Sequence, residues 1–126
     1  MKLWNEKKQD IEKSERVKTV KRYGRLIKVK PEKLAEYREL HRAVWPSVLK
    51  RIRECNIRNY SIFLRDGVLY SYFEYTGNNF ASDMAQMAAD PETQRWWALT
   101  DPCQEPVDTA AEGERWVEME EVFHVD

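Results

Sequence analysis

The sequence predicts an α+β fold with the element order β-α-β-β-α-β, and three patterns point to it. Runs rich in β-branched and aromatic residues occur at 23–30, 57–64, 68–75 and 115–125, which is typical of strands. Apolar residues recur at helical spacing after the first of these runs and again after the third. Between the two middle runs stands the pair Asp66-Gly67, which favours the tight turn of a hairpin.

Residues 1–21 are expected to form a charged arm, and residues 22–126 the folded domain. In the arm, the few apolar residues are scattered among Lys and Glu without a helical or strand period, so no chemistry is assigned to it. The first strand is expected at 23–30, where apolar and polar residues partly alternate.

A helix is expected to follow from Pro31, with Glu32 near the positive end of the helix dipole. Pro46 removes one backbone donor and disfavours helical geometry at Trp45, so we predict a kink or a break there. The side chains expected on the inward face of this helical region are Leu34, Tyr37, His41, Val44, Val48, Leu49 and Ile52.

Two short helices are expected in the second half of the domain. The first carries Phe80, Met84 and Met87 and ends at Asp90-Pro91, and residues 92–99 form the second. Residues 101–113 contain prolines and a glycine and are expected to be a loop before the last strand.

This order is that of the ferredoxin-like fold, in which a four-stranded antiparallel sheet carries its helices on one face. The predicted strands have apolar or aromatic residues on both faces, so the face away from the helices also needs cover. We therefore expect a homodimer whose two copies join through that sheet face.

Length and composition bound the class of protein. The chain has 126 residues, of which 42% are hydrophobic and 34% charged, and its net charge is −1, which suits one globular domain. So balanced a charge offers no positive field for nucleic acid. No apolar run approaches the length of a membrane span and no signal-peptide pattern opens the chain, so no membrane partner is expected and the cytoplasm is the expected compartment.

The two cysteines, Cys55 and Cys103, lie in no CxxC motif and no Cys/His cluster. We expect buried, unreactive thiols, no disulfide framework and no metal site.

The most informative motif is the spacing of Tyr37, His41 and Trp45, which stacks three side chains along one stripe of a helix. Histidine exchanges protons near neutrality without strong tuning, and His41 is the one of two histidines that is set among aromatic residues. A histidine on such a stripe is also common as a buried core group, and the spacing alone leaves both interpretations open. His124 is expected at the surface or an interface.

Further aromatic residues suggest a lined pocket. Trp96 and Trp97 are adjacent on a predicted helix, so their side chains diverge by about 100°. One of them can line a cavity while the other enters the core, although both can be core residues. An indole has a broad apolar face and one N–H donor, which suits a sugar ring. Tyr60 faces either the helices or the open side of the sheet.

Four motifs, taken in order, resemble the L-rhamnose mutarotase family over roughly residues 22–126. They are Glu36-Tyr37-x3-His41-x3-Trp45-Pro46, Asn59-Tyr60-Ser61-Ile62, Gln94-x-Trp96-Trp97 and Glu121-Val122-Phe123-His124. Each motif is weak alone, and it is their shared order that makes the resemblance specific.

The resemblance implies a cytoplasmic, dimeric α/β barrel that interconverts the α and β anomers of L-rhamnose without a cofactor. It also implies that His41 is the catalytic proton donor, while the monosaccharide is bound by Tyr37, Tyr60, Trp96 and Trp97. Residues 101–107, Asp-Pro-Cys-Gln-Glu-Pro-Val, replace the Asn-Pro-Asp-Asn-Ser-Pro-like loop of the better-known rhamnose enzymes. The departure bears on the sugar more than on the reaction, and it admits a related deoxysugar such as L-fucose.

Two other functions are compatible with the same architecture. The dimeric barrel also hosts cofactor-free and haem-linked monooxygenases, and a fold alone does not determine function. A non-enzymatic sugar-sensing module would bind the ligand and gain thermal stability from it without accelerating any reaction.

Overall fold

The computed structural model describes residues 20–126. The charged arm expected at 1–21 lies outside the described residues except at its end, where Lys21 already begins the first strand.

The elements follow one another in the predicted β-α-β-β-α-β order, with each helical region divided in two. They are β1 (Lys21–Val29), η1 (Pro31–Lys33), α2 (Leu34–Arg42), α3 (Pro46–Glu54), β2 (Ile57–Arg65), β3 (Val68–Tyr75), α4 (Phe80–Ala89), α5 (Pro91–Thr100), η2 (Asp101–Cys103), β4 (Gln104–Glu105) and β5 (Val117–Met119). The strands form one antiparallel sheet in the order β2-β3-β1-β4, and β5 also pairs with β1. The predicted α+β class is confirmed.

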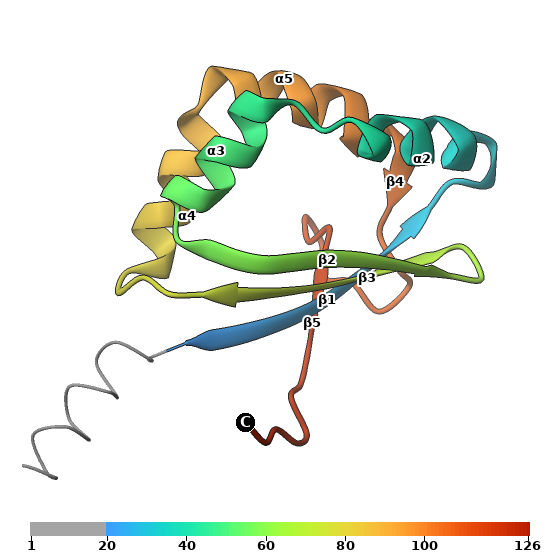
Figure 1. Ribbon diagram of the computed structural model, residues 1–126. Helices are drawn as coiled ribbons and strands as arrows, with labels where there is room; N and C mark the ends of the chain where they lie inside the picture. Colours follow the sequence, from blue (N-terminus) through green and yellow to red (C-terminus); the bar gives the residue numbers. More distant parts are fainter. Residues whose placement is uncertain (1–19) are drawn as a thin grey trace, which may run out of the picture.

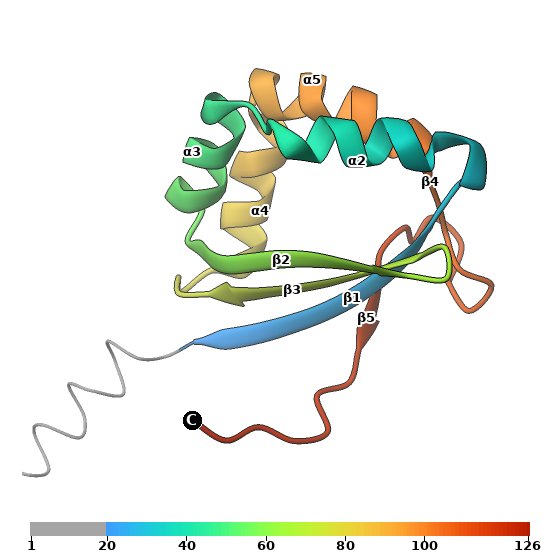
Figure 2. The same cartoon turned by 45° about the vertical axis from the view of Figure 1, so that its right-hand side comes forward.

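Helices α2, α3, α4 and α5 lie over one face of this sheet (Figures 1 and 2). Two apolar clusters fill the space between the layers. The first, under α2, consists of Ile27, Val29, Tyr37, Leu69 and Cys103. The second, under α3 and α4, consists of Tyr23, Ile57, Phe73 and Tyr75. Both cysteines are buried, as the sequence predicts. Within residues 20–126 we find no helix long and apolar enough to cross a bilayer.

The break predicted at Pro46 is confirmed. α2 ends at Arg42, Trp45 has an extended backbone with φ −60° and ψ 134°, and Pro46 begins α3. The predicted inward position of Leu49 is wrong, because the residue is 52% exposed. The break resets the helical phase, so α3 buries Val48 and leaves Leu49 on its outer side.

The predicted hairpin turn and the predicted end of the helix at Asp90-Pro91 are also confirmed. The hairpin between β2 and β3 turns at Asp66 and Gly67, whose φ angles are 50° and 75°, the left-handed geometry that such two-residue turns require. α4 ends at Ala89, and α5 begins after Asp90, whose carboxylate accepts the backbone N–H of Thr93 at 3.0 Å.

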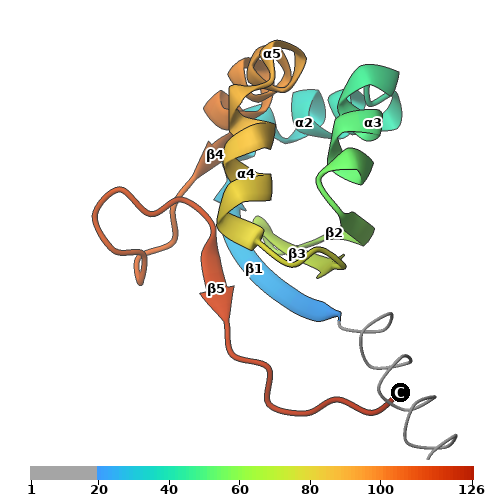
Figure 3. The same ribbon diagram turned by 90° about the vertical axis from the view of Figure 1, so that its left-hand side faces the viewer.

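The fourth strand differs from the prediction of a single run at 115–125. β4 pairs with Lys28 and Val29 and lies in the stretch predicted to be a loop. β5 pairs only with residues 24–26, after which the chain leaves the sheet (Figure 3). The physical reason is that β1 offers a single free edge of limited length, and two short segments share it. Val122 and Phe123, predicted within the strand, are 89% and 80% exposed.

The face of the sheet away from the helices is here called the open sheet face. It exposes Phe63, which is 63% accessible, together with Tyr70 and Met119, which are each 37% accessible. In Figures 1 and 2 the C-terminal segment passes below this face.

Candidate active site

Tyr37 and His41 lie on the inward stripe of α2, one helical turn apart. Tyr37 is 5% exposed, and its ring centroid is 4.2 Å from that of His41. Trp45 has left the stripe because the helix stops before it, but its ring packs edge-on against Trp96 at 5.3 Å. The predicted stack of three therefore becomes a stack of two with a third ring beside it.

The orientation of the His41 ring is fixed by the backbone of its own helix. Nδ1 lies 2.8 Å from the carbonyl oxygen of Tyr37. A carbonyl oxygen only accepts hydrogen bonds, so Nδ1 carries the proton of this pair. Nε2 is then an acceptor in the neutral ring and a donor in the charged one. No side chain of residues 20–126 forms a hydrogen bond with Nε2, so this nitrogen is available to a ligand.

Two side chains of α5 complete, with Tyr37 and His41 of α2, what is here called the helical wall of the pocket. Trp96 is 6% exposed, and its ring meets the His41 ring edge-on with centroids 5.5 Å apart. Trp97 is half-buried. Both indoles line the same pocket as His41. The two adjacent tryptophans thus diverge as the sequence predicts, with one packed deeply and the other nearer the surface.

Tyr60 reaches the pocket because of an irregularity in β2. The pairing of β2 with β3 shifts register between Arg58 and Ser61, and Asn59 has a φ of 50°. The extra residue of such a bulge reverses which side chains face which side. Tyr60 consequently lines the pocket together with Ile62, and the alternative that the sequence left open, the open sheet face, is not the one adopted.

The bulge is held from the neighbouring strand. The amide Nδ2 of Asn59 donates to Glu74 Oε1 at 2.8 Å, and the Tyr72 hydroxyl donates to Glu74 Oε2 at 2.8 Å. These two hydrogen bonds lower the pKa of the Glu74 carboxyl below its usual value. Glu74 therefore stays charged and able to accept from Asn59.

The two pocket tyrosines remain protonated at neutral pH. Burial raises the pKa of the Tyr37 phenol, although the hydrogen bond from Gln104 acts in the opposite direction. Tyr60 is 44% exposed as a whole residue, but burial of its phenol group raises its pKa, opposed by the Arg25 guanidinium. Both hydroxyls can therefore donate hydrogen bonds.

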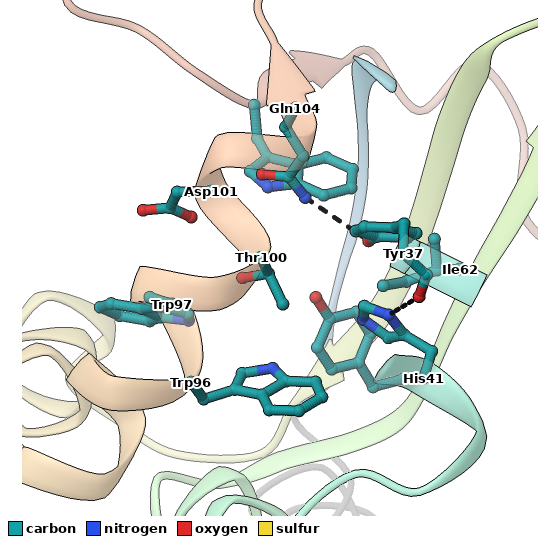
Figure 4. Close-up of a pocket in the computed structure, with 10 residues that line it drawn as sticks. Tyr37, His41, Ile62, Trp96, Trp97, Thr100, Asp101 and Gln104 are labelled. Carbon is teal, nitrogen blue, oxygen red and sulfur yellow. Dashed lines mark hydrogen bonds between the residues drawn. The ribbon is translucent and has the colours of Figure 1, made fainter. Parts of the chain in front are cut away.

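Figure 4 shows the pocket, with Tyr37 and His41 on one side and the side chains of α5 on the other. All five residues singled out by the sequence line it. Five more residues line the pocket that sequence reasoning did not select: Ile62, Thr100, Asp101, Gln104 and Trp116. Two of them, Asp101 and Gln104, fall within 101–107, where the family loop is replaced, and that departure was the one available signal.

Other polar residues lie away from the pocket. His124 is exposed and pairs with Asp126 at 2.8 Å. Among residues 20–126, no group of three or more His, Cys, Asp or Glu side chains is arranged to hold a metal ion.

Comparison with known proteins identifies the family. The family model described as L-rhamnose mutarotase matches residues 22–125. The chain belongs to the L-rhamnose mutarotase family. A member from Oceanobacillus iheyensis is 30% identical over 115 residues, covering 85% of this chain and 100% of that protein. The L-rhamnose mutarotase of Sinorhizobium fredii is 31% identical over 109 residues, covering 84% of this chain and 99% of the relative.

Solved structures support the fold of this mutarotase family member. The crystal structure of the L-rhamnose mutarotase from Formosa agariphila superposes with a TM-score of 0.65 at 19% identity, covering 84% of this chain and 99% of that one. Tetracenomycin F2 cyclase from Streptomyces glaucescens, a type-II polyketide cyclase, superposes with a TM-score of 0.58 at 13% identity and the same coverage. At these identities the likeness concerns the fold alone, and the same fold carries unrelated chemistry.

Proposed function

We propose that this protein interconverts the α and β anomers of L-rhamnose, or of a related deoxysugar such as L-fucose. Membership of the L-rhamnose mutarotase family favours this activity over a monooxygenase and over a sugar-sensing module. The observation that carries the proposal is a histidine with one nitrogen anchored to backbone and the other free, inside an aromatic pocket.

The reaction requires two proton movements. The ring oxygen gains a proton while the anomeric hydroxyl loses one, and the ring opens to an aldehyde. The C1–C2 bond then rotates, and the ring closes on the other face of the carbonyl. No electrons leave or enter the sugar, so no cofactor is required by the chemistry.

In this proposal His41 is the catalytic residue and delivers the proton to the ring oxygen from Nε2. The bond from Nδ1–H to the Tyr37 carbonyl holds the ring in position in both of its protonation states. Positioned acid–base help contributes roughly 10²–10⁴-fold to a reaction rate, which is adequate for a reaction that also proceeds unaided. Asp101 is the carboxylate that lines the pocket, and it is our candidate for accepting the anomeric proton.

The aromatic side chains bind the sugar. The hydroxyls of Tyr37 and Tyr60 hold sugar hydroxyls, while Trp96 and Trp97 pack against the apolar face of the ring and its methyl group. A 6-deoxy sugar suits such a wall better than its hydroxylated counterpart, because a methyl group against an indole leaves no polar group unpaired.

The decisive experiment is saturation-transfer NMR between the two anomers of each sugar. With protein present, saturation of the α-anomer signal should reduce the β-anomer signal of L-rhamnose or L-fucose far more than in buffer. Equal transfer with and without protein, for both sugars, contradicts the proposal. If the sugar raises the melting temperature without raising the exchange rate, the result favours a non-enzymatic sugar-sensing module over a mutarotase. A Soret band on adding haem would favour the monooxygenase.

We further propose that the working form is a homodimer, a dimeric α/β barrel joined through the open sheet face, in the cytoplasm. The exposure of Phe63 at 63%, opposite Tyr70 on the neighbouring strand, supports this arrangement. Sedimentation velocity should show a dimer for the wild type and a monomer for Phe63→Glu. Glu39→Gln, an exposed position on α2 in the helix layer, serves as the control away from that face. A wild-type monomer at micromolar concentration contradicts the dimer.

A further inference from the structure

Gln104 is a buried polar residue of the replaced family loop. It is 6% exposed, lines the pocket, and stands opposite Val29 in the pairing of β4 with β1. The backbone before it is tied to the residue that follows β1, since Lys30 N–H donates to the Cys103 carbonyl at 2.8 Å. Its side-chain amide is therefore held on a rigid edge of the sheet, beside Tyr37.

Arg115 determines which way this amide points. Its Nη2 lies 3.2 Å from Gln104 Oε1 and 3.1 Å from the carbonyl oxygen of Asp101. A guanidinium has only donors, so the amide group must turn its oxygen to Arg115. The NH₂ group then faces the Tyr37 hydroxyl, with Nε2 at 3.4 Å from the phenolic oxygen. Figure 4 shows this contact between Gln104 and Tyr37.

The direction of this hydrogen-bond chain has a consequence for Tyr37. Its oxygen accepts a proton from Gln104, so its own O–H is not directed to Gln104. In residues 20–126 no other side chain or carbonyl forms a hydrogen bond with that hydroxyl. Because burial raises the pKa of the Tyr37 phenol, the proton stays in place at neutral pH. A buried, protonated hydroxyl without an acceptor is thus aimed at the pocket.

We propose that Arg115 and Gln104 are positioning residues, which act through Tyr37 by making it an obligatory hydrogen-bond donor to an oxygen atom of the sugar. The chain of donors runs from Arg115 to Gln104, from Gln104 to Tyr37, and from Tyr37 to the ligand. The effect on catalysis rests on the proposed mutarotase activity, whereas the direction of the chain does not.

The test reverses the direction of the hydrogen bond between residue 104 and Tyr37 while keeping the shape of the side chain. Gln104→Glu replaces the amide with a carboxylate, which accepts from Arg115 as before but also accepts from Tyr37. The Tyr37 hydroxyl then donates its hydrogen bond to residue 104 instead of to the sugar, so kcat/KM for anomer exchange should fall about tenfold. Glu105→Gln is the matched control, since it alters one charge at the next position, where the side chain is close to Lys28. It should exchange at the wild-type rate.

A double-mutant cycle separates this role from a structural one. In a Tyr37→Phe background there is no hydroxyl to redirect, so Gln104→Glu should cause no further loss. If Gln104 merely supports the fold, the tenfold loss appears in both backgrounds, and the proposal is overturned. An unchanged rate for Gln104→Glu in the wild-type background overturns it as well.

A second variant and a second readout keep the test independent of folding and of activity. Gln104→Met removes the donor without adding charge and should lower kcat/KM about threefold, again only when Tyr37 is present. The ¹³Cζ resonance of labelled Tyr37 should move in Gln104→Glu, because the phenol changes from acceptor to donor toward residue 104. An unmoved resonance overturns the proposed direction, whether or not the protein accelerates anomer exchange.

Discussion

The pocket has a helical wall and a strand wall, which hold their side chains by different means. In the helical wall, Tyr37 and His41 meet because they are four residues apart on α2, and His41 is anchored to a carbonyl of the same helix. In the strand wall, Tyr60 faces the pocket because β2 has a bulge at Asn59, which is held by Glu74 of the next strand.

The difference teaches how robust each wall is to mutation. A helical stripe is a local property and survives most changes elsewhere in the chain. A bulge depends on one left-handed residue and on a bond between two strands. We therefore expect replacements in the helical wall to act through the side chain removed, and replacements at the bulge to act on a residue that they do not touch.

The largest effect is expected from His41→Ala, which removes the proton donor of the helical wall. Anomer exchange should slow by roughly 10²–10⁴-fold, measured as kcat/KM by saturation-transfer NMR. His124→Ala, at the exposed second histidine, should exchange at the wild-type rate. Wild-type exchange by the His41 variant would remove this residue from its proposed role.

Within the helical wall, the two tryptophans should separate stability from binding. Trp96 is 6% exposed and packs against His41 and Trp45, so Trp96→Ala should lower the free energy of unfolding by about 3–5 kcal/mol. Trp97→Ala, at a half-buried site, should cost about 1 kcal/mol and mainly raise KM. Urea denaturation and exchange kinetics measure the two effects. Equal losses of stability would show that both indoles are core residues.

The strand wall should respond to a change at Asn59, outside the pocket lining. Asn59→Ala must adopt a φ of 50°, which Asn tolerates better than Ala, so the substitution costs up to about 1–2 kcal/mol, and it loses the bond to Glu74. We expect Tyr60 to be misdirected and KM to rise about fivefold. Asn59→Gly keeps the backbone geometry available and should lie nearer the wild type in stability. If both variants bind sugar as the wild type does, the bulge does not direct Tyr60.

The smallest effect is expected in alkaline solution, where the two pocket tyrosines can be compared directly. The pKa of Tyr37 is raised by burial, while an unfolded tyrosine ionises near pH 10. The stability linked to Tyr37 is fully present below about pH 10 and is lost as pH rises above it. Tyr37→Phe should flatten the fall in unfolding free energy between about pH 9 and 11. Tyr60→Phe should flatten it as well, because burial also raises the pKa of the Tyr60 phenol; a fall as steep as in the wild type in both variants would contradict this linkage.

Much of this protein could be predicted from its sequence, because the features concerned are local. The spacing of Tyr37 and His41 determines that they share a helical face, Pro46 ends α2, and Asp66-Gly67 makes the hairpin. Each follows from the geometry of a few consecutive residues. The order of these elements and the co-linear motifs were also enough to predict the α+β class and the family.

Only the tertiary structure decided the features that depend on a partner distant in the chain. Residue spacing could not choose the face for Tyr60, because Asn59 and Glu74 set the bulge from two strands. Gln104 was hidden in a stretch without periodicity, and it gains its orientation from Arg115 and its place from β1. The length of the last strand was overestimated, because alternating apolar and polar residues do not ensure that a neighbouring strand has a free edge to pair with. Periodicity determines which side chains can share a face, but the pairing of strands determines which face it is.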